Sequence, residues 1–450
     1  MKPDTARSTA LRVLCESEKE GAHLYSLLRK AENNMFFSAK DKALINKIVS
    51  GVYERLLTID FVLDKFSKIP VKKMKLYIRW ILRMGVYQLL FTDRIHDGAA
   101  VSESVELARD FGFEKLTPFV NGVLRNIGRN KYKLDFPSDS IKYSVPDWIC
   151  GRLENYCGKE NSVEIFSAYL TDSPLTIRLD ERYSLDERRG FIEKMKQKSE
   201  GLEIKSHSLL PYTYILKGSS DIRGLYGFDE GYFAVQDAAA QLVVEAAGIK
   251  DGDVVIDVCA APGGKTLHAY SKTHIKGIKN ESFVYAFDLT ENKCGLIREN
   301  AHRMKADLNL DVRVHDSTKT LDELKEKADV LICDLPCSGL GVIGRKADIK
   351  YRIKEDDIYE LQKLQRRILK ASAAYLKKGG TLMYSTCTLT REENEDNFEY
   401  IKSELGFKPR DLEKYIPDII KDIPSVKNGY ITLFPGKYKT DGFFISGFKK

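Results

Sequence analysis

From Phe233 onward, short apolar runs alternate with stretches of helical periodicity. The runs are VVIDV, FVYAFDL, DVRVHD, ADVLICDLP and GGTLMYSTC. Strands that alternate with helices need crossover connections, and a doubly wound, mostly parallel sheet provides them. We therefore predict a Rossmann-like α/β domain over residues 233–450, ending in an antiparallel hairpin formed by YITLF and DGFFISGF.

The N-terminal third has a helical pattern instead. Ser38 and Asp41 have the spacing of a capping box, and apolar residues from Leu44 to Leu57 then recur on one helix face. We predict an all-α domain over residues 1–140, followed by a linker near residues 132–145. Residues 146–232 have the order helix, helix, strand, helix, strand, strand, which predicts a small α+β domain.

The charge is concentrated in the N-terminal third. Residues 1–140 hold 24 Lys and Arg against 17 Asp and Glu, whereas the remainder holds 48 of each. The net charge of +7 therefore belongs to the helical domain. Such a domain is expected to bind a polyanion, although a solvated lysine-rich surface gives the same count. The basic stretch KKMKLYIRWILRMGVYQLLF is open to the same two interpretations, an RNA-facing helix or a solvated helix edge.

The cysteine pattern and the absence of long apolar runs favour a particular cellular compartment, the cytoplasm. Eight cysteines scattered over 450 residues form no disulfide framework, and their spacing matches no zinc site. We find neither a signal peptide nor a run of about 18 apolar residues. We therefore expect a cytoplasmic, monomeric protein with reduced thiols, no metal and no membrane contact.

The stretch VVIDVCAAPGGKTLHA, residues 254–269, predicts a strand, a tight turn and the start of a helix. Backbone N–H groups at such a turn lack helical partners and are available to a ligand. Asp288 follows Gly263 by 25 residues, close to the spacing at which an acidic residue binds ribose hydroxyls. Because the G-x-G-x-x-G fingerprint is missing, S-adenosylmethionine suits the site better than NAD.

Polar or reactive residues stand at the carboxyl ends of the predicted strands. Ligands bind at these ends in open α/β sheets. The residues are Asp288, Asp316, Asp334 with Cys337, and Cys387. Asp316 would lie near the adenine amino group. Any one of these aspartates by itself is more often a helix cap or a loop carboxylate, but their joint occurrence at several strand ends favours a ligand site.

The two cysteines suggest nucleophilic chemistry. A thiolate that adds to carbon 6 of cytosine activates carbon 5 for methylation, and a second thiol can assist release. An ordinary thiol, with a pKa of about 8.5, is mostly protonated at neutral pH, so a lowered pKa would help. Spacing does not say which cysteine attacks, and simple burial of both remains an alternative.

Several motifs together resemble the RNA 5-methylcytosine methyltransferases. They are CAAPGGKT, ICDLPCSGLGVIGRKADIKYR, YSTCTLTREENEDNF and DGFF, and GYFAVQDAAAQ is also similar to that family. The N-terminal stretch SESVELARDFGFEKLTPFVNGVLRNI resembles the NusB-like RNA-binding domain. The combination is similar to the members of the family that act on bacterial 16S ribosomal RNA.

The resemblance implies a role for each candidate residue. Cys387 corresponds to the nucleophile and Cys337 to the cysteine that assists product release. The residues implied for S-adenosylmethionine binding are Cys259, Ala260, Ala261, Pro262, Gly263, Gly264, Lys265, Asp288, Asp316 and Asp334. Asp334 would also contact the cytosine edge, and Leu335 stands where alanine is common in the family.

The resemblance also implies a substrate, cytosine 967 of 16S rRNA, and a middle domain similar to a truncated RNA-recognition fold. Two alternatives stay open from the sequence. One is a 5-methylcytosine methyltransferase that acts on another RNA, such as tRNA. The other is an RNA-binding, antitermination-type factor whose methyltransferase domain is inactive.

Overall fold

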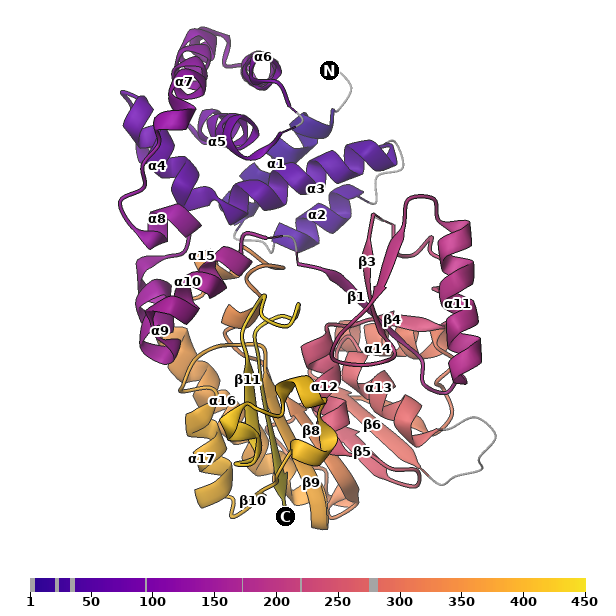
Figure 1. Ribbon diagram of the computed structural model, residues 1–450. Helices are drawn as coiled ribbons and strands as arrows, with labels where there is room; N and C mark the ends of the chain where they lie inside the picture. Colours follow the sequence, from indigo (N-terminus) through magenta and orange to yellow (C-terminus); the bar gives the residue numbers. More distant parts are fainter. Residues whose placement is uncertain are drawn as a thin grey trace. The chain divides into compact units, whose positions relative to one another are not determined.

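The computed structural model describes residues 5–20, 24–32, 37–93, 95–171, 173–218, 221–274 and 282–450. Its internal contacts divide the chain into two compact units (Figure 1). The first comprises residues 1–171 and 343–352, and the second comprises residues 172–342 and 353–450. Within the described segments, no helix is long and apolar enough to span a membrane.

The first unit is helical, as predicted. Its α-helices are α1 (Ala6–Glu20), α2 (Leu24–Glu32), α3 (Ala39–Glu54), α4 (Leu56–Phe66), α5 (Leu76–Phe91), α6 (Asp97–Asp110), α7 (Thr117–Asn130), α8 (Asp139–Tyr143), α9 (Asp147–Cys157), α10 (Lys159–Ala168) and α15 (Ile349–Arg352), with short 3₁₀ helices η1 (Val71–Lys73), η2 (Glu114–Leu116) and η3 (Lys131–Lys133). The predicted capping box is confirmed, because Asp41 N donates to Ser38 Oγ at 3.2 Å and Ser38 N donates to Asp41 Oδ2 at 3.2 Å.

The structure differs from the expected linker near residues 132–145. Helix α8 forms inside that stretch because Ser138 Oγ accepts a hydrogen bond from Ile141 N at 3.3 Å and caps the helix. By their contacts, α8, α9 and α10 belong to the helical unit. The two helices that we assigned to the α+β domain therefore pack with the preceding ones.

A second difference concerns residues 343–352, which we expected inside the α/β domain. These residues belong to the helical unit, where Lys350 Nζ donates to the Glu54 carbonyl at 2.9 Å. The Tyr351 hydroxyl lies 3.0 Å from Ser144 Oγ, and Ala347 is buried. The chain that directly follows the Cys337 loop is thus held by helices that are far away in sequence.

The second unit contains two sheets. The smaller one has the antiparallel order β2-β3-β1-β4, from β1 (Leu175–Leu179), β2 (Glu203–Ser206), β3 (Thr213–Lys217) and β4 (Phe233–Val235), with α11 (Leu185–Lys198) between β1 and β2. Phe233, which we expected to begin the α/β domain, pairs with Leu179 in this sheet. Strand β4 therefore completes the small α+β part.

The larger sheet has eight strands in the order β10-β12-β9-β8-β5-β6-β7, with β11 paired to β12. The strands are β5 (Val254–Asp257), β6 (Phe283–Asp288), β7 (Leu310–Val314), β8 (Ala328–Asp334), β9 (Leu376–Thr386), β10 (Lys408–Pro409), β11 (Tyr430–Leu433) and β12 (Phe443–Lys449). Strands β5 to β9 are parallel and β11 pairs antiparallel with β12, so the predicted doubly wound sheet and terminal hairpin are confirmed.

Helices connect and cover this sheet. They are α12 (Ala238–Ala247), α13 (Gly264–Thr273), α14 (Glu291–Arg303), α16 (Glu355–Ser372) and α17 (Glu395–Ser403), with 3₁₀ turns η4 (Asp322–Leu324), η5 (Leu340–Val342), η6 (Ala373–Tyr375), η7 (Glu413–Tyr415), η8 (Asp418–Ile420) and η9 (Pro424–Val426). Successive residues of β5 enter different apolar clusters, Val255 on one side and Ile256 on the other. The sheet is therefore buried on both faces, as parallel sheets usually are.

Candidate active site

The turn between β5 and α13 is hydrogen-bonded to the end of β6. Gly263, with φ of +102°, caps α13, and its N–H donates to the Ala260 carbonyl at 2.7 Å. Ala261 N donates to Asp288 Oδ2 at 3.0 Å. Because glycine tolerates this left-handed conformation, the sequence Pro-Gly-Gly allows the strand to turn directly into the helix. The structure thus brings together the predicted glycine turn and the predicted acidic residue of the next strand.

Asp334 joins three segments at the carboxyl ends of the strands. Lys265 Nζ, from the start of α13, donates to Asp334 Oδ2 at 2.5 Å. Ser385 Oγ, from β9, donates to Asp334 Oδ1 at 2.7 Å. Lys265 Nζ also lies 5.1 Å from the ring centroid of Phe443, in the DGFF motif. Four motifs that are separate in the sequence therefore meet around one carboxylate.

The other two predicted carboxylates differ in exposure. Asp288 is buried and pairs with Lys293 at 2.9 Å. Asp316 is more exposed, and hydrogen bonds from the hydroxyl and the N–H of Thr318 lower its pKa. Its neighbour Ser317 donates to the Val258 carbonyl at 2.6 Å, which ties the loop after β7 to the end of β5.

The two candidate cysteines are in contact. Cys337 Sγ and Cys387 Sγ lie 3.3 Å apart, and both are free thiols, as are the other six cysteines. The hydrogen bond with Cys387 and burial both raise the pKa of Cys337 well above its usual value. The structure therefore places two thiols where one small group can meet both of them.

Buried polar residues at the strand ends and behind the cysteine loops were missed by our sequence interpretation. Asp257 is buried at the end of β5, accepts a hydrogen bond from Thr266 Oγ1 at 2.7 Å, and has a pKa raised by burial to about 7. Glu393 and Asn394 are buried behind the cysteine loops. The sequence signal was the run REENED, which is separated from the YSTC motif by three residues and which entered the sequence interpretation only as part of the resemblance.

A charged cluster joins α12, α13 and the segment after β1 in the same unit. Glu181, Glu245 and His268 bring ligand atoms within 4.8 Å of one another. Lys272 Nζ reaches Glu181 at 2.9 Å and Glu245 at 2.6 Å, so a cationic side chain already pairs with both carboxylates. We interpret the cluster as a structural ion-pair network.

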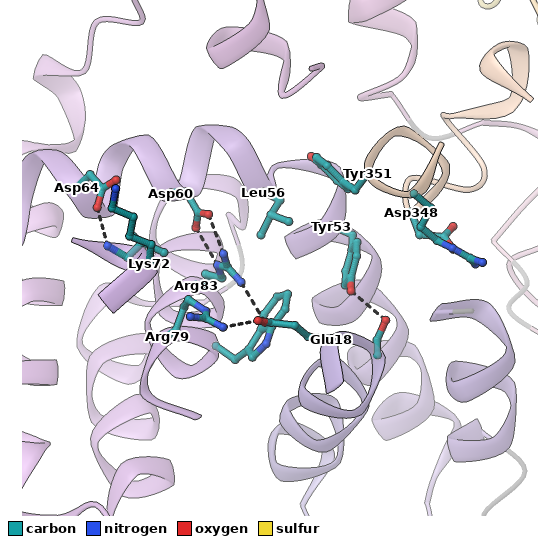
Figure 2. A pocket seen from close by; sticks show the side chains of 14 residues that line it. Glu18, Tyr53, Leu56, Asp60, Asp64, Lys72, Arg79, Arg83, Asp348 and Tyr351 are labelled. Atoms are coloured by element: carbon teal, nitrogen blue, oxygen red, sulfur yellow. Dashed lines mark hydrogen bonds and ion pairs between the residues drawn. The ribbon is translucent and has the colours of Figure 1, made fainter. Parts of the chain in front are cut away.

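The helical unit contains a cavity of about 610 Å³, which Figure 2 shows. Its lining includes four basic and four acidic side chains, and Arg83 makes two bonds of 2.7 Å to Asp60. Arg79 pairs with Glu18. The basic residues of α5, Arg79 and Arg83, therefore form ion pairs inside the helical unit. They form neither a solvated helix edge nor an RNA-facing surface, which were the two expectations for this stretch.

The comparisons with known proteins show the family of this chain. Residues 245–449 match the family model described as 16S rRNA methyltransferase RsmB/F, and residues 4–129 match the NusB family. The chain is 33% identical to the probable ribosomal RNA small subunit methyltransferase B of Bacillus subtilis, over 100% of both chains. The chain belongs to the RsmB/F family. Ribosomal RNA small subunit methyltransferase B of Escherichia coli is 32% identical, with 99% of this chain and 98% of that protein covered.

Solved structures show the same fold as this RsmB/F chain. The crystal structure of PH0851 superposes with a TM-score of 0.77 at 23% identity and covers 98% of this chain and 99% of its own. NSun6 from Pyrococcus horikoshii, crystallised with SFG, gives a TM-score of 0.56 at 22% identity over 68% of this chain and 98% of its own. The multidomain prediction, with NusB-like helices and an α/β methyltransferase fold, is therefore confirmed.

Proposed function

We propose that this RsmB/F protein transfers a methyl group from S-adenosylmethionine to carbon 5 of a cytosine in 16S rRNA, with cytosine 967 as the target. The 3.3 Å contact between Cys337 and Cys387 carries the proposal. Two thiols at one point of a methyltransferase fold suit a reaction that forms a covalent bond to the base and later breaks it.

The residues around the glycine turn fit the cofactor. The first N–H groups of α13 lack helical partners and suit its carboxylate, and Asp288 at the end of β6 suits ribose hydroxyls. Asp316, in the loop after β7, suits the adenine amino group. Bound there, S-adenosylmethionine would supply an electrophilic methyl group.

Cys387 acts as the nucleophile in this proposal. Its thiolate bonds to carbon 6 of cytosine, which makes carbon 5 nucleophilic, and carbon 5 then takes the methyl group, with S-adenosylhomocysteine as the leaving group. When a base removes the carbon 5 proton, the electron pair of that C–H bond forms the double bond between carbon 5 and carbon 6, and the sulfur leaves carbon 6 as a thiolate. Cys337, in contact with Cys387, assists this release.

The remaining residues hold the base and the RNA. Asp334, fixed by Lys265 and Ser385, presents a carboxylate that acts on Cys337 and suits the amino edge of cytosine. The target base leaves its stack to reach this site, as bases do in enzymes that modify them. The NusB-like unit, which carries the positive charge, binds the RNA backbone.

Bisulfite sequencing of ribosomal and transfer RNA tests the proposal. Cells that lack the protein should lose one 5-methylcytosine in 16S rRNA, and the wild-type gene should restore it where the Cys387→Ser gene does not. Loss of methylation in tRNA alone would show that tRNA, and not 16S rRNA, is the substrate. Unchanged methylation in both RNAs would refute the proposal.

A further inference from the structure

Glu393 is a buried carboxylate between β9 and α17, with no exposed surface. Both of its oxygens accept hydrogen bonds. Ser338 N donates to Oε1 at 2.9 Å, and Gln365 Nε2 donates to the same oxygen at 3.0 Å. Ser338 Oγ donates to Oε2 at 2.5 Å, and Thr390 Oγ1 donates to it at 2.9 Å. Four donors thus converge on one side chain.

These bonds join the loops of the two cysteines. Ser338 directly follows Cys337, and its hydroxyl lies 2.6 Å from the hydroxyl of Thr388, which directly follows Cys387. Since Ser338 Oγ gives its proton to Glu393, Thr388 must donate to Ser338. Leu340 N in turn donates to Thr388 Oγ1 at 3.3 Å. One continuous chain of donors therefore runs from the two loops to the Glu393 carboxylate.

Asn394, the next residue, fixes the chain on both sides of Cys387. Its Oδ1 accepts from Thr386 Oγ1 at 2.6 Å, and its Nδ2 donates to the Thr388 carbonyl at 3.0 Å. The Cys387 carbonyl accepts from Gly341 N at 3.0 Å, which returns to the loop of the other cysteine. The separation of the two Sγ atoms is thus set by bonds that begin at residues 393 and 394.

A carboxylate is a costly choice for a buried position. Burying a charge is unfavourable unless hydrogen bonds compensate it, and burial indeed raises the pKa of Glu393. An apolar side chain would fill the same space without that cost. The role of Glu393 must therefore depend on the donors that it orients.

From this arrangement we propose that Glu393 is a positioning residue, which holds the Cys337 and Cys387 loops in register so that both thiols reach one cytosine. The inference rests on the proposed function. Bond formation by one thiol and release assisted by the other require both sulfurs near the same ring, and a misplacement of about 1 Å is enough to reduce a rate about 100-fold.

The test compares Glu393→Ala with Glu393→Gln in the full-length protein. Glu393→Ala leaves Ser338 N without its acceptor and leaves Gln365 Nε2 with only the Pro336 carbonyl, so we expect kcat to fall about 100-fold while S-adenosylmethionine binding, measured by calorimetry, changes less than about twofold. Glu393→Gln keeps one acceptor oxygen, and Ser338 can reverse its hydroxyl to accept from the new amide. This variant should retain kcat to within about tenfold.

The pH dependence of adduct release distinguishes a positioning role of Glu393 from a packing role. The Glu393 charge is one of the contributions that raise the pKa of Cys337. Glu393→Gln should therefore shift the pH dependence of adduct release toward lower pH. The matched control is Glu245→Gln, in the ion-pair network on α12, which makes the same chemical change away from the cysteines and should leave that profile unmoved.

If Glu393→Ala does not fold, a comparison of Ser338→Ala with Thr390→Val tests the same inference. Ser338→Ala removes the link between the loops and should lower kcat more than Thr390→Val, which removes one outer donor. Wild-type kcat in folded Glu393→Ala or in Ser338→Ala would overturn the inference. An active Cys387→Ser would instead overturn the proposed nucleophile, so the two failures are distinguishable.

Discussion

Cys337 Sγ lies 3.3 Å from Cys387 Sγ, although 50 residues separate the two cysteines in the chain. Strands β8 and β9 pair in parallel, with Asp334 opposite Ser385, so the loops that follow them leave the sheet side by side. The contact therefore follows from the strand order. It makes the division of labour between the two thiols experimentally accessible.

Replacement of the proposed nucleophile should separate chemistry from cofactor binding. We expect Cys387→Ser to lower methyl transfer to 16S rRNA by about 10³-fold or more, because a hydroxyl is a far weaker nucleophile than a thiolate. S-adenosylmethionine affinity should stay near the wild-type value. Both quantities are measured on one preparation, and turnover near wild type would exclude Cys387 as the nucleophile.

Replacement of the other cysteine should trap the reaction. In Cys337→Ala the bond to carbon 6 still forms but breaks slowly, so a protein-RNA species should survive denaturing gel electrophoresis. Cys387→Ser is the control and should give no such species. If the adduct forms with Cys387→Ala but not with Cys337→Ala, the two roles are reversed.

The glycine turn gives a prediction for the cofactor. Gly263 has φ of +102°, and a Cβ there would lie 3.4 Å from Ile297 Cγ2. We expect Gly263→Ala to weaken S-adenosylmethionine binding about tenfold, because a backbone strain of about 1–3 kcal/mol would distort the turn. Gly252→Ala is the matched control, since Gly252 has φ of +87° with open space around it. Equal affinities in calorimetry would place the cofactor elsewhere.

Lys350 should make the helical unit sensitive to pH. Burial lowers the pKa of Lys350 to about 7, from 10.5, so between these values the unfolded chain binds more protons than the folded one. Stability should therefore rise with pH from about 7 to 10.5, by at most about 1.4 kcal/mol per pH unit. Lys350→Met should flatten this rise in denaturant titrations, whereas exposed Lys68→Met should not.

The basic charge of the helical unit gives a prediction for RNA. Lys72, Lys73 and Lys75 are exposed around η1. If they contact phosphates, replacing all three with alanine should weaken 16S rRNA binding and reduce the slope of log affinity against log salt by about 2 to 3. Alanine at the exposed Lys402, Lys408 and Lys414 is the control. Equal slopes would favour the solvated-surface interpretation of the lysines around η1.

The sequence by itself determined the elements and their chemistry. The central strands β5 and β8 read as short apolar runs, as expected of parallel strands that are buried on both faces, and that pattern is local. The Pro-Gly-Gly turn and the acidic residue at the next strand end are also local signals, and the structure joins them through Ala261 and Asp288. The motifs around Cys337 and Cys387 pointed to the family, which the comparisons confirm.

Only the tertiary structure decided which distant residues meet. Spacing placed no limit on the distance between Cys337 and Cys387, because strand order is a property of the whole sheet. Glu393 lies in an acidic run that gives no local sign of burial, and its donors come from its neighbour Thr390 and from two distant residues, Ser338 and Gln365. The docking of residues 343–352 among helices, with Lys350 on the Glu54 carbonyl, had no local signal either, since long-range packing determines where a short segment is buried.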